Sequence, residues 1–108
     1  MNAPFEELAG LDKLVHEPAR LAITTALSAC DSADFLFLQR LTGLSKGNLS
    51  AHLAKLEAGG LIAISKQFAG KRPQTWISLT ETGRRSVDAH WARLDDLRRR
   101  ARAWRTGR

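Results

Sequence analysis

The four-residue stretch Thr42-Gly43-Leu44-Ser45 constrains the fold of this chain more than any other feature. It separates two segments, residues 35–41 and 49–56, whose apolar residues recur at helical spacing. The glycine can adopt a positive φ, the leucine can point inward and Ser45 can cap the following helix. Two helices joined by so short a glycine-containing turn form a helix-turn-helix unit.

Two helical patterns precede this unit. Leucines and a valine spaced three and four residues apart predict a short N-terminal helix over residues 1–15. A second helix is expected from Glu17, with Pro18 in its first turn, where the missing amide hydrogen of proline needs no partner. The polar stretch 31–34 ends that helix and supplies a cap for the next one.

The helical spacing of apolar residues stops at Gly59-Gly60, a glycine pair that ends the second helix of the unit. Residues 61–68 and 75–79 favour β structure, and the segment between them contains glycine, proline and two basic residues. We therefore expect a two-stranded hairpin with a long tip over residues 69–74. Proline and glycine should stop ladder pairing in this tip and leave Lys71 and Arg72 pointing outward.

A last helix is predicted from an N-cap at Thr80 to about Trp104. Its apolar seam has alternating spacings of three and four residues, which is typical of helices that pair with one another or pack on their own domain. A chain of this length can hardly cover both Trp91 and Trp104, so we favour a homodimer. The residues expected at its interface are Leu8, Leu11, Val87, Trp91, Leu94, Leu97, Ala101 and Trp104.

The net charge of +6 is unevenly distributed over the 108 residues. Residues 35–75 contain six Lys or Arg and a single acidic residue, Glu57, which indicates a surface that binds a polyanion. The length predicts one domain, 1–108, and is too short for most α/β enzymes. No apolar stretch is long enough to span a bilayer, residues 1–10 do not resemble a secretory signal, and Cys30 has no partner, so we expect a cytoplasmic protein.

The second helix of the unit has an unusual outer face. Its three leucines cluster on one side, and the opposite ridge consists of small residues, with polar residues on both flanks. A ridge without bulk allows a helix to enter the major groove closely, while the flanking side chains reach base edges and phosphates. The alternative is an ordinary soluble helix face with some alanine.

The stretch LTGLSKGNLSAHLAKLEAGGLI, followed by a hairpin tipped with lysine and arginine and by LTETGR, resembles the small winged helix-turn-helix transcriptional regulators of the MarR/ArsR-like superclass. The resemblance covers residues 14–83. It implies a mainly α (α+β) fold, with a winged helix-turn-helix core over residues 17–79 and a two-stranded β-wing. The flanking helices, 1–15 and 80–105, would be dimerisation helices.

The same resemblance implies a dimeric regulator, a repressor, that binds pseudo-palindromic double-stranded DNA. It places on or near the major groove Ser45, Lys46, Asn48, Ser50, Ala51, His52 and Lys55. It assigns to the DNA-contacting wing Lys66, Lys71, Arg72, Gln74 and Thr75. The sequence identifies no effector.

Several other functions remain open at this point. The match to G-x-S-x-G at residues 43–47 follows a helix rather than a strand, so Ser45 is interpreted as a helix cap and no enzymatic activity is expected. The histidines and Cys30 lack the spacing of a metal site, and no metal or cofactor is expected. A protein-interaction adaptor and a nucleic-acid-binding protein without sequence preference are the alternative functions.

Overall fold

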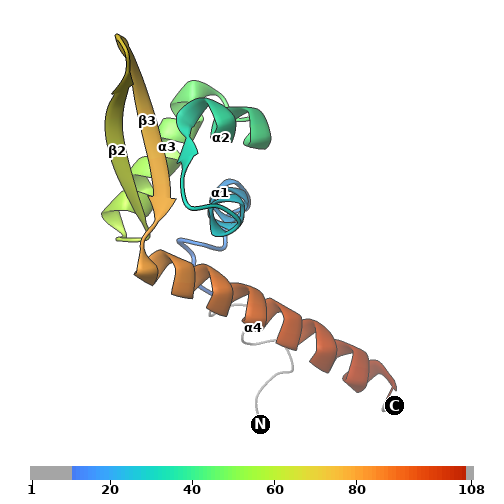
Figure 1. Ribbon diagram of the computed structural model, residues 1–108. Helices are drawn as coiled ribbons and strands as arrows, with labels where there is room; N and C mark the ends of the chain where they lie inside the picture. The colour runs from blue at the N-terminus through green and yellow to red at the C-terminus, as the bar shows by residue number, and fades with distance from the viewer. Residues whose placement is uncertain (1–10, 107–108) are drawn as a thin grey trace.

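The computed structural model describes residues 11–106 (Figure 1). This part of the chain forms four helices and three strands. They are α1 (Pro18–Ser28), β1 (Ala33–Asp34), α2 (Phe35–Thr42), α3 (Lys46–Ala58), β2 (Ile62–Ala69), β3 (Arg72–Leu79) and α4 (Glu81–Thr106). The winged helix-turn-helix fold and the mainly α class expected from the sequence are confirmed.

The turn between α2 and α3 has the predicted geometry. Gly43 adopts a left-handed conformation with φ of 71°, and its amide donates to the Gln39 carbonyl at 2.9 Å. The Ser45 hydroxyl accepts the Asn48 amide hydrogen at 3.1 Å and caps α3. Leu44 is half-buried and packs against the core. Local signals in the sequence therefore placed this turn correctly.

The sheet has three strands in the order β1-β3-β2, one more than the predicted two-stranded hairpin. The extra strand, β1, pairs Ala33 with Ile77 and Asp34 with Trp76. Asp34 is also the N-cap of α2, because its carboxylate accepts the Phe37 amide hydrogen at 2.7 Å. The sequence predicted a cap in this stretch but no strand, since two residues are too few to show a period.

The hairpin is longer and its tip tighter than predicted. The ladder between β2 and β3 continues to the pair Ala69–Arg72, so only Gly70 and Lys71 form the turn. Gly70 has a φ of 64°, which suits the first central position of a two-residue turn. The expectation of an unpaired tip over residues 69–74 is wrong. Pro73 is tolerated within β3 because β1 pairs only with residues 76–77 and leaves the other edge open there.

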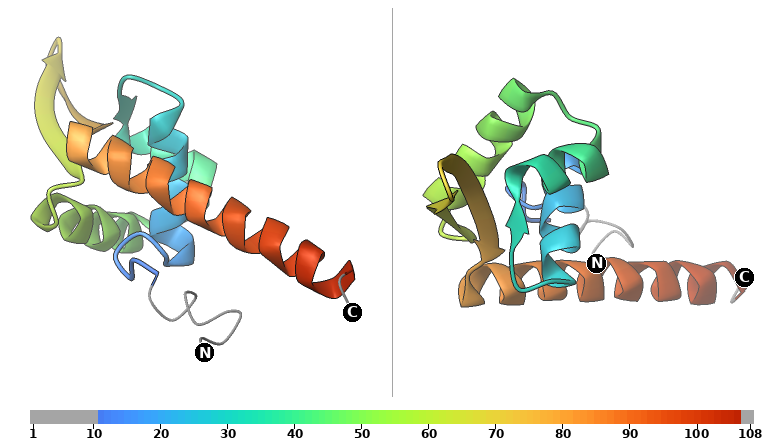
Figure 2. Two further views of the ribbon diagram at one scale, coloured as in Figure 1. Left: turned by 90° about the horizontal axis from the view of Figure 1, so that it is seen from below. Right: turned by 45° about the horizontal axis from the view of Figure 1, so that its top comes forward.

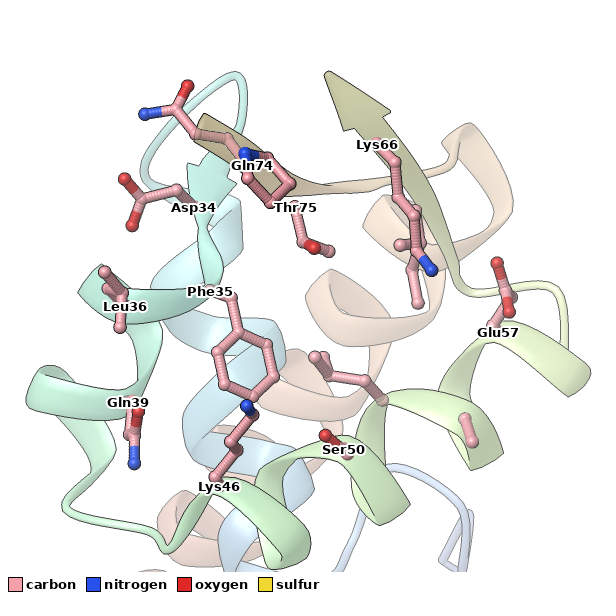
Figure 3. Close-up of a pocket in the computed structure, with 14 residues that line it drawn as sticks. Asp34, Phe35, Leu36, Gln39, Lys46, Ser50, Glu57, Lys66, Gln74 and Thr75 are labelled. Atoms are coloured by element: carbon pink, nitrogen blue, oxygen red, sulfur yellow. The ribbon is translucent and has the colours of Figure 1, made fainter. Parts of the chain in front are cut away.

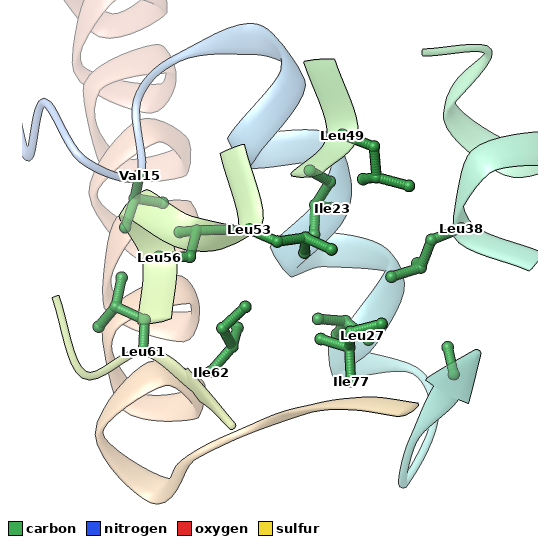
Figure 4. Packing of buried hydrophobic residues seen from close by; sticks show 11 residues of the cluster. Val15, Ile23, Leu27, Leu38, Leu49, Leu53, Leu56, Leu61, Ile62 and Ile77 are labelled. Carbon is green, nitrogen blue, oxygen red and sulfur yellow. The ribbon is translucent and has the colours of Figure 1, made fainter. Parts of the chain in front are cut away.

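The hydrophobic core lies between α1, α3 and the inner face of the sheet (Figure 4). Ile23 and Leu27 extend from α1, and Ile77 from β3, and all three are fully buried. The leucine stripe of α3, Leu49, Leu53 and Leu56, packs on the same cluster. The core therefore determines which face of α3 remains outside.

Segment 11–17 differs from the predicted N-terminal helix, of which residues 1–10 lie outside the described part. Residues 11–17 form turns rather than a helix. The Asp12 carboxylate accepts the Leu14 amide hydrogen at 2.9 Å, a local bond that competes with helix formation. Val15 is fully buried in the core, and His16 Nδ1 lies 3.0 Å from His90 Nε2 of α4. This segment thus ties the start of α1 to the last helix.

Helix α4 begins as predicted and projects well beyond the rest of the protein (Figure 2). The Thr80 hydroxyl donates to the Gly60 carbonyl at 2.6 Å and accepts the Gly83 amide hydrogen at 2.9 Å. The 26 residues of α4 span about 39 Å at the α-helical rise. Its outer half carries a run of arginines, and none of the helices within residues 11–106 is long and apolar enough to cross a membrane.

The residues predicted at the dimer interface differ in their burial within a single chain. Leu11, Val87 and Leu97 are already buried within a single chain, with exposed fractions of 5%, 1% and 5%. They are therefore buried without a partner chain, in a fold in which α1, β3 and His16 contact α4. Leu8 lies outside the described residues. Trp91 and Trp104 remain 41% and 57% exposed.

We predict that Gly83→Ala destabilises the protein by about 1–3 kcal/mol. A Cβ at position 83 would overlap the Leu61 carbonyl group, and backbone cannot move aside as a flexible side chain can. Gly47→Ala is the matched control: it is also helical, has open space around it and should stabilise α3 by up to about 1 kcal/mol. Urea denaturation measures both, and equal stability of the two variants would contradict the close approach.

We also predict that the protein loses stability as the pH falls through 6.5, the usual pKa of histidine. Burial lowers the pKa of His90 below its usual value of 6.5, and neighbouring His16 lowers it further, although Asp12 acts in the opposite direction. The unfolded chain then binds more protons than the folded one as the pH falls, so the free energy of unfolding decreases. His90→Gln should flatten this dependence in urea titrations. An unchanged slope would show that other groups cause it.

Candidate nucleic-acid interface

The outward face of α3 follows directly from the burial of its leucines. Leu49, Leu53 and Leu56 are 0–3% exposed, so the opposite side of the helix faces solvent. Of the seven residues predicted on this helix, six are exposed: Ser45, Lys46, Asn48, Ser50, Ala51 and Lys55. Ser45 uses its hydroxyl as the cap, whereas the others are free of a core role. The exposed ridge consists of glycine and alanine, with polar residues beside it.

His52, the seventh of these residues, has a different environment. It is half-buried, and its Nδ1 lies 3.2 Å from Arg20 Nη1 and 3.6 Å from the Glu17 carboxylate. Arg20 also donates from Nε to the Leu14 carbonyl at 2.7 Å. These contacts attach the flank of α3 to the start of α1 and to segment 11–17. The structure therefore places His52 at the edge of the face rather than on its ridge.

Glu17 anchors this group of residues. Its carboxylate accepts the amide hydrogens of Ala19 and Arg20, at 3.2 and 2.9 Å, and caps α1. Partial burial would raise the pKa of Glu17, but these amide hydrogen bonds and the charges of His52 and Arg20 lower it below the usual value. Glu17 is therefore ionised at neutral pH and holds the cationic side chain of Arg20 in place.

The hairpin presents a second polar surface next to α3. Lys66, Lys71 and Arg72 are exposed, whereas Gln74 and Thr75 are half-buried. Arg72 and Gln74 belong to β3 and not to the turn, so only Lys71 occupies the tip as predicted. No Asp or Glu occurs between Ile62 and Leu79. The hairpin is thus a cationic arm, and no acidic residue within it neutralises its lysines and arginine.

A cleft of about 560 Å³ separates α2 and α3 from the hairpin (Figure 3). Lys46 and Ser50 line it from α3, and Lys66, Gln74 and Thr75 line it from the strands. The structure thereby brings five of the twelve predicted DNA-contacting residues to one concave surface. The remaining predicted residues lie at the N-cap of α3, on its ridge and other flank, or near the hairpin turn.

Sequence reasoning missed the wall of the cleft that α2 provides. Asp34, Phe35 and Gln39 line it, and so does Glu57 near the end of α3. Nothing in the local sequence marks these residues, because their approach depends on how α2 crosses the sheet. Among the residues with described positions, no group of three His, Cys, Asp or Glu is close enough together to hold a metal ion.

This arrangement of a helix-turn-helix, a cationic hairpin and a long terminal helix defines a known class of protein. Residues 19–97 match the family of winged helix DNA-binding domains, and the chain belongs to that family. The resemblance to small winged helix-turn-helix transcriptional regulators, inferred above from the sequence, is therefore confirmed.

Individual relatives agree with this assignment. The chain is similar to the HTH-type transcriptional regulator YgaV of Escherichia coli, with 39% identity over 62 residues, 57% of this chain and 63% of YgaV. A transcriptional regulator homologue from Pyrococcus horikoshii superposes with a TM-score of 0.78 and 29% identity, covering 86% of this chain and 94% of the other. A MarR family regulator from Silicibacter pomeroyi shares the fold, with a TM-score of 0.66, 24% identity and coverage of 86% and 60%.

Proposed function

We propose that this protein is a sequence-specific, double-stranded DNA-binding transcriptional regulator that acts as a homodimeric repressor on a pseudo-palindromic operator. One observation carries the proposal: the exposed ridge of α3 is free of bulky side chains and lies beside a hairpin that contains cations and no acidic residue. The family to which the chain belongs supports it.

The ridge of α3 is suited to the major groove. Gly47 and Ala51 allow close approach, and Asn48 and Ser50 flank the ridge with hydrogen-bonding groups that can read base edges. Asn48 offers both a donor and an acceptor, the combination that recognises adenine in the major groove. Lys46 and Lys55 lie farther out on the helix, where phosphates would lie.

The hairpin supplies contacts that do not depend on sequence. Arg72 is exposed in the last pair of the ladder and Lys71 occupies the turn. Cations in these positions bind phosphates or the narrow minor groove and determine affinity and its salt dependence. His52 and Arg20 have a supporting role in this proposal, because their contacts with each other and with segment 11–17 set the position of α3.

The homodimer is proposed to form through α4. Its outer half extends past the body, so the molecule measures 65 Å along its longest axis and 23 Å across (Figure 2). Leu94 precedes buried Leu97 on the apolar stripe of α4, Ala101 and Trp104 continue the stripe outward, and Trp104 is 57% exposed. A second copy that covers this stripe would give two α3 helices related by a two-fold axis, which a pseudo-palindrome requires.

Titration of the purified protein against DNA from upstream of its own gene, and against a scrambled duplex, tests the proposal. At about 0.15 M salt we expect a preference of roughly 10³-fold or more and two protomers per site. Equal, salt-sensitive binding to both duplexes would instead support nucleic-acid binding without sequence preference. Absence of binding to either duplex would support the protein-interaction adaptor.

We predict that Arg72→Ala and Asn48→Ala have separable effects on DNA binding. Loss of one phosphate contact should weaken binding to all duplexes and reduce the slope of log K against log salt by about 0.9. Loss of one base contact should reduce discrimination at one base-pair position by about 1–3 kcal/mol and leave the slope unchanged. Fluorescence anisotropy over a salt series measures both, and identical behaviour of the two variants would refute the division of roles.

We predict that Leu94→Glu converts the dimer into a monomer, because a carboxylate would be buried in the apolar interface of α4. The matched control is Ala92→Glu, which places the same charge on the exposed opposite face of α4. Sedimentation velocity reports the oligomeric state, and circular dichroism checks that both variants fold. Dimers in both variants would exclude this face of α4 as the interface.

A further inference from the structure

Phe68 lies near the end of the β2–β3 hairpin with its aromatic ring in solvent. It is 74% exposed, more than any other large apolar residue in the part of the chain that the structure describes. It pairs with Pro73, one rung before the pair that closes the hairpin. A single exposed apolar residue needs no functional explanation. What distinguishes Phe68 is the side of the hairpin on which it lies.

Phe68 lies on the hairpin face that is directed toward α3. Side chains alternate between the two faces of a strand, so Ile62, Ile64 and Lys66 share the face of Phe68. Ile62 is buried in the core, whereas Ile64 and Lys66 line the cleft beside α3 (Figure 3). Pro73, opposite Phe68, also lines this cleft. This face of the hairpin therefore starts in the core, runs past α3 and ends at Phe68.

The charge around Phe68 indicates an anionic partner. Lys66, Lys71 and Arg72 are exposed on the same hairpin, and residues 62–79 contain no Asp or Glu. The two acidic residues of the cleft lie on its other walls, before α2 and near the end of α3. A partner of this arm must therefore offer both negative charge and an apolar surface.

We propose that Phe68, with Pro73 beside it, packs against deoxyribose in the minor groove next to the major groove that α3 occupies. The inference rests on the proposed function. The walls of the minor groove combine phosphates with the apolar faces of the sugars, and apolar side chains are known to enter this groove. Such a contact is the same for every sequence. Because it neutralises no phosphate, it also leaves the number of released counterions unchanged.

The position of the hairpin favours DNA over a second copy of the chain. The tip of the hairpin and the outer end of α4 lie at opposite ends of the molecule (Figure 1). A dimer formed through α4 therefore leaves Phe68 uncovered. In the same dimer the two hairpins would flank the pair of α3 helices on their outer sides, where the adjoining minor grooves of an operator lie.

The test compares the salt dependence of DNA binding by the full-length protein and three variants. The probes are duplexes of about 30 base pairs, long enough for two half-sites and their flanks, from upstream of its own gene and with a scrambled sequence. The variants are Phe68→Ala, Phe68→Leu and, as the matched control on the other face of β2, Gln67→Ala. Phe68 has little contact with the core, so thermal denaturation should give the same midpoint for all four proteins.

We expect Phe68→Ala to weaken binding to both duplexes by about tenfold or more, the loss that corresponds to one buried aromatic side chain. The slope of log K against log salt should stay at the wild-type value, in contrast with Arg72→Ala. Phe68→Leu should recover part of the affinity, because leucine remains apolar. Gln67→Ala should bind as the wild type does.

Two results would overturn the inference while the proposed function stands. One is wild-type affinity of Phe68→Ala for a duplex that the wild type binds. The other is a loss of affinity that comes with a change of salt slope or with dissociation of the dimer in sedimentation velocity, because Phe68 would then act through charge or through protein contacts. Failure of the wild type to bind either duplex would overturn the proposed function and this inference with it.

Discussion

The burial of the leucine stripe of α3 is the interaction on which the rest of the structure depends. Leu49, Leu53 and Leu56 fill the core between α1 and the sheet, and their removal from water is the main favourable term for this helix. The first half of α3 has a weak intrinsic preference for helix, since it contains glycine, asparagine, serine and histidine, whereas its second half consists of leucine, alanine, lysine and glutamate. Packing therefore both stabilises α3 and selects the glycine- and alanine-rich ridge that remains in solvent.

The hairpin and α4 both start in this core and extend away from it. The hairpin starts as part of the core at Ile62 and Leu79 and then leaves it, so that its outer residues are free to contact a partner. Helix α4 does the same on the other side, buried at Val87 and Leu97 and exposed at Trp104. A small core thus carries two arms, the hairpin and α4. The short segment 11–17 contacts α4 through His16, and its Leu14 carbonyl accepts a hydrogen bond from Arg20 of α1.

Much of the fold could be predicted because its signals are local. Gly43 and Ser45 determine the turn and the cap before α3, and Thr80 determines the start of α4, through bonds to residues three or four positions away. Strand β1 and the tight turn at Gly70 were missed or misplaced. A strand of two residues forms only when β3 is present, and Pro73 is compatible with a strand only where the neighbouring edge is open.

The sequence by itself determined the helix-turn-helix, the hairpin without acidic residues and the ridge of small residues on α3. Local composition and spacing decide these features. The tertiary structure decided which of those residues meet. In the folded chain, His52 contacts Arg20 and Glu17 at the edge of α3, and Lys46 and Lys66 line the same cleft. Val87 and Leu97 are buried within a single chain. These outcomes depend on contacts between residues distant in sequence, whose geometry is set only when the elements pack together.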